Sequence, residues 1–138
     1  MGRICTSNTF ITLYTMACCQ VFYFIFFFEA FKEYGENFIH DDEYLSLIGA
    51  IGMICNSVAR FIGPTLLDHY DFIKIYKIVW FIITFQILTI SLMVKTPVLY
   101  LISNICIFAS EGAFVAMLPV VTLKIFGMKR GPTIYSYL

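Results

Sequence analysis

A stretch without a single charged side chain covers residues 4–28, and it limits the fold more than any other feature of the sequence. About 18 such residues span a lipid bilayer as an α-helix, whereas about 10 to 14 also fit a buried helix of a soluble domain. The chain has 138 residues, of which 60% are apolar and 13% charged, against about 25% charged in soluble domains. These proportions exclude an ordinary soluble domain and predict an integral membrane protein.

Three further charge-free stretches follow, and each reaches membrane-spanning length only by including or passing one charge. They cover residues 44–59, 78–94 and 96–110. Continuous apolar runs favour helices over a β-barrel, whose strands alternate apolar and polar residues. We therefore predict an all-α integral membrane protein with four transmembrane helices. They are expected at about residues 11–30, 44–67, 74–94 and 97–123, with the start of a further helix after residue 131.

The basic residues of the short loops predict the orientation, because cytoplasmic loops of membrane proteins carry the excess of Lys and Arg. With the N-terminus inside, only Lys32 and Lys95 lie on the outer face. The sequence therefore predicts a multi-pass protein with both termini in the cytoplasm. The basic residues of the inner face are then Arg3, Lys74, Lys77, Lys124, Lys129 and Arg130.

Composition also excludes several classes of function. Nine basic and nine acidic residues give a net charge of zero, so no nucleic-acid partner is expected. The five cysteines lie mostly in apolar runs and are interpreted as packing residues rather than a disulfide framework. The acidic run at residues 40–43 is expected to cap the second helix, because four adjacent side chains cannot converge on one metal ion. No motif indicates catalysis or a cofactor, so we expect neither an enzyme nor a metal site.

One charge lies deep in the predicted second helix. Arg60 is about 12 Å from the helix end at Asp68, where a charge is costly unless it faces a partner or a water-filled cavity. Asn56 shares its face with three glycines, which allow close approach of another helix or a ligand. A structural arginine, neutralised by neighbouring groups, and an anion contact in a transport pathway are both open interpretations. The glycines of this face are Gly49, Gly52 and Gly63.

A second charge, Glu111, lies at interior depth in the fourth helix, with Asn104 on the same face. A carboxyl group there can hold a proton, pair with Arg60, or do each in turn. In the first helix Gln20 borders a polar stripe, and these side chains either line a pathway or bond to neighbouring helices. The stripe consists of Thr12, Thr15, Cys19 and Tyr23. The third helix is expected to face lipid, with Trp80 as an aromatic anchor.

Three segments carry a family resemblance: FKEYG, DDEYLSLIGAIGMICNSVARFIGPTLLD and EGAFVAMLPVVTLKIFGMKRGPTIYSYL. They contain Asn56, Arg60 and Asp68 at helical spacing, followed by F-G-x-x-x-G-x-x-x-Y. This combination resembles the C-terminal half of major facilitator superfamily transporters, and is closest to the oxalate/formate antiporter and monocarboxylate transporter branch. The resemblance implies the seventh to tenth of twelve helices, with an arginine at the position of Arg60 that contacts the substrate carboxylate or takes part in its charge relay.

The chain departs from that family at two places. Pro64 stands where the family usually has glycine, and the glycine and paired arginines expected after Asp68 are absent. Asp68 itself fits a gating loop. The resemblance also implies a partner, the missing N-terminal half of the same transporter, since such proteins bind substrate between two halves and alternate access between them.

The leading hypothesis is a partial secondary active transporter for small organic anions, monocarboxylates or dicarboxylates. Arg60 would bind the carboxylate, Asn56 would assist, and Glu111 would tune the charge or carry a proton, with Tyr23 and Gln20 completing the site. The alternative is a self-contained four-helix membrane protein that oligomerises. It would act as a small proton-coupled exporter using Glu111 or as a scaffold without transport.

Overall fold

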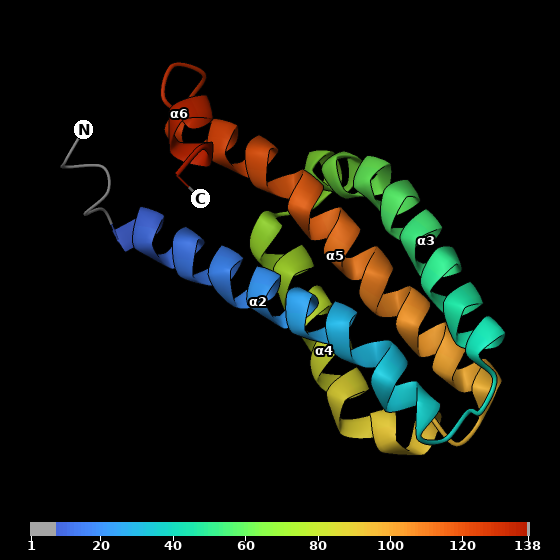
Figure 1. The fold of residues 1–138 in the computed structure, drawn as a ribbon. Coiled ribbons are helices and arrows are strands. Elements are labelled where there is room, and N and C mark those ends of the chain that lie inside the picture. The colour runs from blue at the N-terminus through green and yellow to red at the C-terminus, as the bar shows by residue number, and fades with distance from the viewer. Residues whose placement is uncertain (1–7, 138) are drawn as a thin grey trace.

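The computed structural model describes residues 8–137, which form five helices and no strand (Figure 1). Four of these helices are long and apolar enough to cross a membrane, which confirms the predicted all-α membrane class. Arg3 and Cys5 lie outside the described residues. The helices are α2 (Asn8–Glu36), α3 (Asp42–His69), α4 (Phe72–Met93), α5 (Pro97–Phe126) and the short α6 (Gly131–Tyr135).

The helices follow the predicted order but are longer at several ends. The largest difference is in α2, which continues to Glu36 instead of ending near residue 30. The polar segment after residue 30 remains helical because Phe31 and Gly35 face the interior, where the phenol ring of Tyr100 lies close to Gly35. The predicted further helix after residue 131 is present as α6.

The acidic run before α3 caps that helix, as expected. Asp41 is the N-cap residue, and its carboxylate accepts a hydrogen bond of 3.0 Å from the backbone N–H of Tyr44. Asp42 and Glu43 lie in the first turn, where negative charge is favourable against the helix dipole. Local side-chain chemistry therefore determines where α3 begins.

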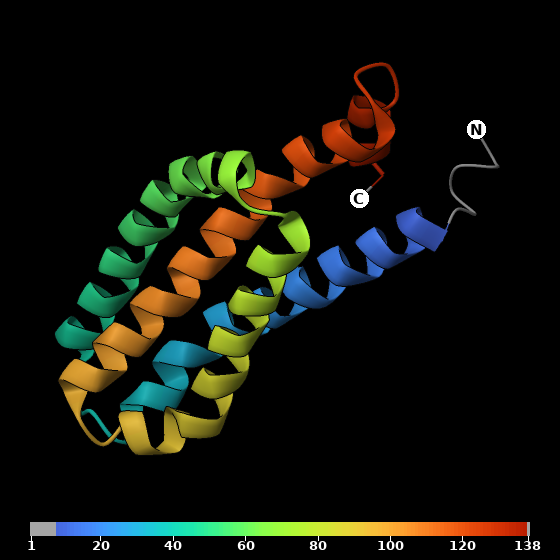
Figure 2. The same cartoon turned by 180° about the vertical axis from the view of Figure 1, so that it is seen from behind.

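Helix α5 lies at the centre of the bundle, and the other three long helices surround it (Figures 1 and 2). Its closest neighbour is α3, along most of the length of both helices. Helix α4 packs on another side of α5, whereas α2 makes far fewer close approaches. The start of α2 and the end of α5 lie at the same end of the bundle (Figure 1). More than half of the apolar span of α5 is buried, against less than a third in the other three.

Glycines allow the close approach of α3 and α5. A Cβ atom added to Gly112 would lie 2.2 Å from the carbonyl oxygen of Asn56, and one added to Gly63 would lie 2.5 Å from that of Ala113. Gly52 lies against the ring of Phe108 in the same interface. Small residues of this kind let helix backbones pack directly in membrane proteins.

Each of these two helices also contains an internal proline. Pro64 in α3 and Pro119 in α5 have no N–H to donate, so the carbonyl groups one turn earlier lose their usual helical partner. For Pro64 that carbonyl belongs to Arg60. Helix α3 curves along its length (Figure 1), as expected for a helix with an internal proline.

Candidate functional site

Two apolar clusters fill the bundle, and polar side chains lie between them along the helices. One cluster includes Leu13, Val79 and Met117, and the other includes Phe27, Ile48 and Phe108. The intervening positions carry buried polar groups on all four long helices. These buried groups are Gln20 of α2, Asn56 of α3, Gln86 of α4, and Ser110 and Glu111 of α5, and the layer continues along α5 to Ser103 and Asn104, which lie within the second cluster.

The central contact of this polar layer joins α2 to α5. The Nε2 atom of Gln20 donates a hydrogen bond of 2.8 Å to the Oε2 atom of Glu111. Gln20 is 1% exposed and Glu111 is 3% exposed, although Glu111 lies near the middle of its helix. The structure thus brings two sequence-predicted site residues together, and their contact is buried inside the bundle.

Helix α3 contributes the second part of the layer through Asn56. Its Nδ2 atom donates to the carbonyl oxygen of Phe108 at 2.9 Å, and its Oδ1 atom accepts from the Nε of Arg60 at 3.1 Å. Asn56 is 3% exposed, whereas Arg60 is an exposed residue. Asn56 therefore links the guanidinium group to the backbone of α5 and limits its orientation.

The glycine-bearing flank of α3 is packed against other helices within residues 8–137. Gly52 and Gly63 pack against α5, and Gly49 lies near the ring of Phe31 on α2. Of the two possibilities that the sequence leaves open for these glycines, close approach of another helix is the one observed. Arg60 is the exposed member of the predicted face, so any ligand contact on this face must be made there.

Arg60 and Glu111 do not form a direct pair. Within residues 8–137, the ion pairs closer than 4.0 Å are Lys32–Asp42, Lys74–Asp71 and Lys124–Asp68. Arg60 instead bonds to Asn56, and Glu111 bonds to Gln20. Of the possibilities that the sequence leaves open for Glu111, pairing with Arg60 is therefore not observed.

The polar stripe predicted on α2 mostly points outward. Thr12 and Thr15 are exposed, and their hydroxyl groups donate to carbonyl oxygens one turn earlier in the same helix, at 2.8 and 2.9 Å. Tyr23 is half-buried and touches both apolar clusters. Of this stripe and its border, only Gln20 enters the core with a hydrogen bond to another helix.

Sequence reasoning missed a polar contact between α4 and α5. The hydroxyl of Ser103 donates to the Oε1 atom of Gln86, and both residues are buried. The sequence predicts that the third helix faces lipid, and the outer side of α4 exposes Phe81, Phe85 and Leu88. A single amide within the otherwise apolar run FIITFQILTI was the available signal, because an amide in hydrocarbon needs a partner.

Two buried oxygen atoms of the layer have no hydrogen-bond partner among the described residues. They are Oε1 of Gln20 and Oδ1 of Asn104. The amide nitrogen of Asn104 donates to the carbonyl of Tyr100 at 2.8 Å, so this side chain is only half satisfied. Such atoms accept hydrogen bonds from water or from a ligand when either reaches them.

The predicted gating residue, Asp68, lies at the end of α3. Its carboxylate is 3.6 Å from the ammonium group of Lys124, which also donates to the carbonyl of Leu67 at 2.7 Å. Lys124 lies near the end of α5, so this contact ties the ends of the two helices together. A contact between helix ends is compatible with gating and equally with a static tie.

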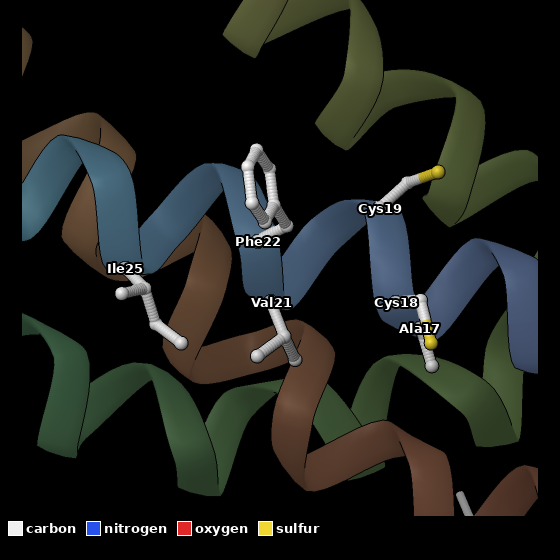
Figure 3. A pocket seen from close by; sticks show the side chains of 6 residues that line it. All are labelled: Ala17, Cys18, Cys19, Val21, Phe22 and Ile25. Carbon is white, nitrogen blue, oxygen red and sulfur yellow. The ribbon is translucent and has the colours of Figure 1, made fainter.

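An open hollow of about 550 Å³ lies along α2 but is separate from the polar layer (Figure 3). Val21 and Ile25 point to one side of the helix, whereas Phe22 and Cys19 point to the other. Ala17 and Cys18 complete the lining, and Gln20 and Tyr23 are not part of it. This apolar hollow has no charged group and offers no contact for an anion.

The side chains of this site are suited to binding a ligand. It offers one exposed guanidinium group, oriented by a buried amide, and one enclosed carboxyl group held by a second amide. Comparison of the chain with protein-family models, with curated proteins and with solved structures finds no match.

Proposed function

We propose that the chain is part of a secondary active transporter that moves small organic anions across a membrane, with Arg60 as the anion contact. The observation that carries the proposal is the exposed guanidinium at membrane depth, held to the buried Asn56. A guanidinium group is always charged and offers a planar pair of donors that fits a carboxylate. The major facilitator resemblance assigns the same role to this position.

The unused donors of Arg60 support this proposal. Within the described part of the chain Arg60 donates one hydrogen bond, from Nε. Both terminal nitrogens are therefore free to donate to the two oxygen atoms of one carboxylate. A charge at such a depth costs about 2.5 to 3.5 kcal/mol on insertion scales when lipid surrounds it. An anion, or a polar segment of another protein, offsets that cost.

The face around Arg60 supports a second half as partner. Large apolar side chains on α3 stand exposed near it, Val58 and Phe61 among them, and they need lipid or protein to cover them. A water-filled path beside Arg60 requires a second wall that α2 to α6 do not supply. The missing N-terminal half implied by the resemblance would supply this wall.

The experiment is anion binding to the full chain in lipid nanodiscs, with formate, oxalate and lactate as probes. We expect Arg60→Ala and Arg60→Lys to weaken binding about tenfold or more, because a charge-assisted hydrogen bond contributes about 1.5 to 3 kcal/mol. Lys95→Ala is the matched control, since it removes an exposed cation far along the chain from the site. Equal affinity in all four proteins would remove Arg60 from an anion site.

A self-contained oligomer remains the second candidate, and the loose packing of α2 favours it. Helix α2 exposes Phe22, Ile25 and Phe26, and a second copy of the chain could cover them. Light scattering in detergent distinguishes the candidates: a stable dimer or larger assembly that takes up no anion would support the oligomer. Monomeric chain that binds anions through Arg60 would support the partial transporter.

A further inference from the structure

A second hollow, on the side of α3 that faces α4, is independent of the anion proposal. Helices α3 and α4 leave the short link at Tyr70 and Asp71 and diverge on either side of α5 (Figure 2). Between them lies a groove of about 560 Å³. Its floor is built from the small residues Ala109, Ser110 and Ala113 of α5, which leave the space unfilled.

The groove is apolar along its length and polar at one end. Its walls are aliphatic, with Ile62 and Leu66 from α3 facing Ile78 and Ile82 from α4. The polar lining residues at the link end are Tyr70 and Lys74, both exposed. From Lys74 to Ile82 the groove follows α4 for about 12 Å.

The charge at the link end favours an anion. Lys124 is 3.6 Å from Asp68, and Lys74 is 3.4 Å from Asp71. Lys77 lies about one turn further along α4 on a neighbouring face, is exposed, and has no acidic group within 4.0 Å among residues 8–137. Of these lysines only Lys74 lines the groove, and around its link end three basic side chains outnumber the two acidic ones by one.

We propose that this groove binds one anionic phospholipid, with an acyl chain between α3 and α4 and the phosphate at Lys74 and Lys77. The profile of the groove matches that molecule, because a phospholipid is apolar along its chains and charged at one end. Basic groups at the polar end of a groove between transmembrane helices bind anionic head groups. A zwitterionic lipid fits the walls equally well but gains no net charge attraction at the lysines.

A tryptophan placed on the groove wall gives a probe for this site. Trp80, the single tryptophan of the chain, packs against Tyr76 and is not part of the groove lining, so the experiments use Ile78→Trp in a Trp80→Phe background. The experiment reconstitutes the full chain in phosphatidylcholine vesicles that contain dibrominated phosphatidylglycerol or, in parallel, dibrominated phosphatidylcholine. Bromine on the acyl chains quenches tryptophan fluorescence at short range, so quenching of the introduced tryptophan reports which lipid occupies the groove.

We expect brominated phosphatidylglycerol to quench more strongly than its mole fraction predicts. Each lysine that contacts the head group should raise the relative affinity about fivefold. Lys74→Gln with Lys77→Gln should abolish the preference, and Lys95→Gln, at the opposite end of α4, should leave it unchanged. Equal quenching by the two lipids in the single-tryptophan chain with both lysines present would overturn the proposal, as would a preference that survives loss of both lysines.

A groove-filling variant separates a site from general surface attraction. Ala109→Leu places a larger side chain on the floor of the groove while both lysines remain. We expect it to remove most of the preference for phosphatidylglycerol. A preference that persists in this variant would mean that the lysines attract the membrane surface without a groove, and it would contradict the proposal.

Discussion

The contacts of α3 and of α2 with the central helix α5 differ in kind. Helix α3 meets α5 along most of its length through backbone surfaces, with Gly63 and Gly112 at the closest points. Helix α2 approaches α5 closely at few places, and the hydrogen bond from Gln20 to Glu111 is a central one. Close packing is specified by the absence of side chains, whereas the looser contact includes two buried hydrogen bonds, from Gln20 to Glu111 and from the hydroxyl of Tyr100 to the carbonyl oxygen of Phe31. The first interface is expected to be rigid and the second able to separate.

The largest effect is expected from closing the α3–α5 gap. In Gly112→Ala the new methyl group would lie 2.2 Å from the carbonyl oxygen of Asn56, so one backbone must move. Overpacking of this kind costs about 1 to 3 kcal/mol. The free energy of unfolding, measured from helix content in mixed detergent micelles, should fall by that amount.

Gly49→Ala is the matched control on α3. Its added methyl group would meet the tip of the Phe31 ring at 3.1 Å, and a ring can move where a backbone cannot. Little or no loss of stability is expected, because alanine also favours the helix. A similar loss in the two variants would show that the α3–α5 interface is no tighter than the contact with α2.

A smaller effect is expected at the α2–α5 pair. Gln20→Leu leaves the carboxyl group of Glu111 buried without its described partner, whereas Glu111→Leu removes that buried group altogether. Gln20→Leu should therefore destabilise the chain more when Glu111 is present than when it is absent. A double-mutant cycle should give a coupling of about 1 kcal/mol, within the range for hydrogen bonds between membrane helices. Additive single effects would mean that this bond does not hold α2.

The smallest effect is expected between α4 and α5. Gln86→Leu removes the acceptor of the Ser103 hydroxyl, which can then turn to a carbonyl of its own helix. The free energy of unfolding should fall by about 0.6 kcal/mol, the average for such bonds in membranes. Ser91→Ala serves as the control, since its weak bond with Tyr34, at 3.5 Å, is exposed. A loss comparable to that of Gly112→Ala would make this contact a main determinant of packing.

Much of the candidate site was visible in the sequence, because charges and amides inside apolar runs stand out. Glu111, Gln20, Asn56 and Arg60 were recognised in this way, and the structure places three of them in the core. The partners were not predicted: Glu111 bonds to Gln20 rather than to Arg60. Which polar side chains pair depends on how each helix is rotated about its axis and how deep it lies in the membrane. The positions of polar residues in the sequence specify this only to within about one helical turn.

The sequence by itself determined that the chain is helical, that four helices are long enough to cross a membrane, and where α3 begins. Hydrophobic length and local capping decide these features without reference to distant residues. Only the tertiary structure decided that Gly52 and Gly63 pack against α5, that Gly49 meets Phe31 of α2, and that Arg60 stays exposed. In a bilayer the apolar faces of a helix are almost equivalent, so the choice of face depends on how closely backbones and polar groups of different helices fit together.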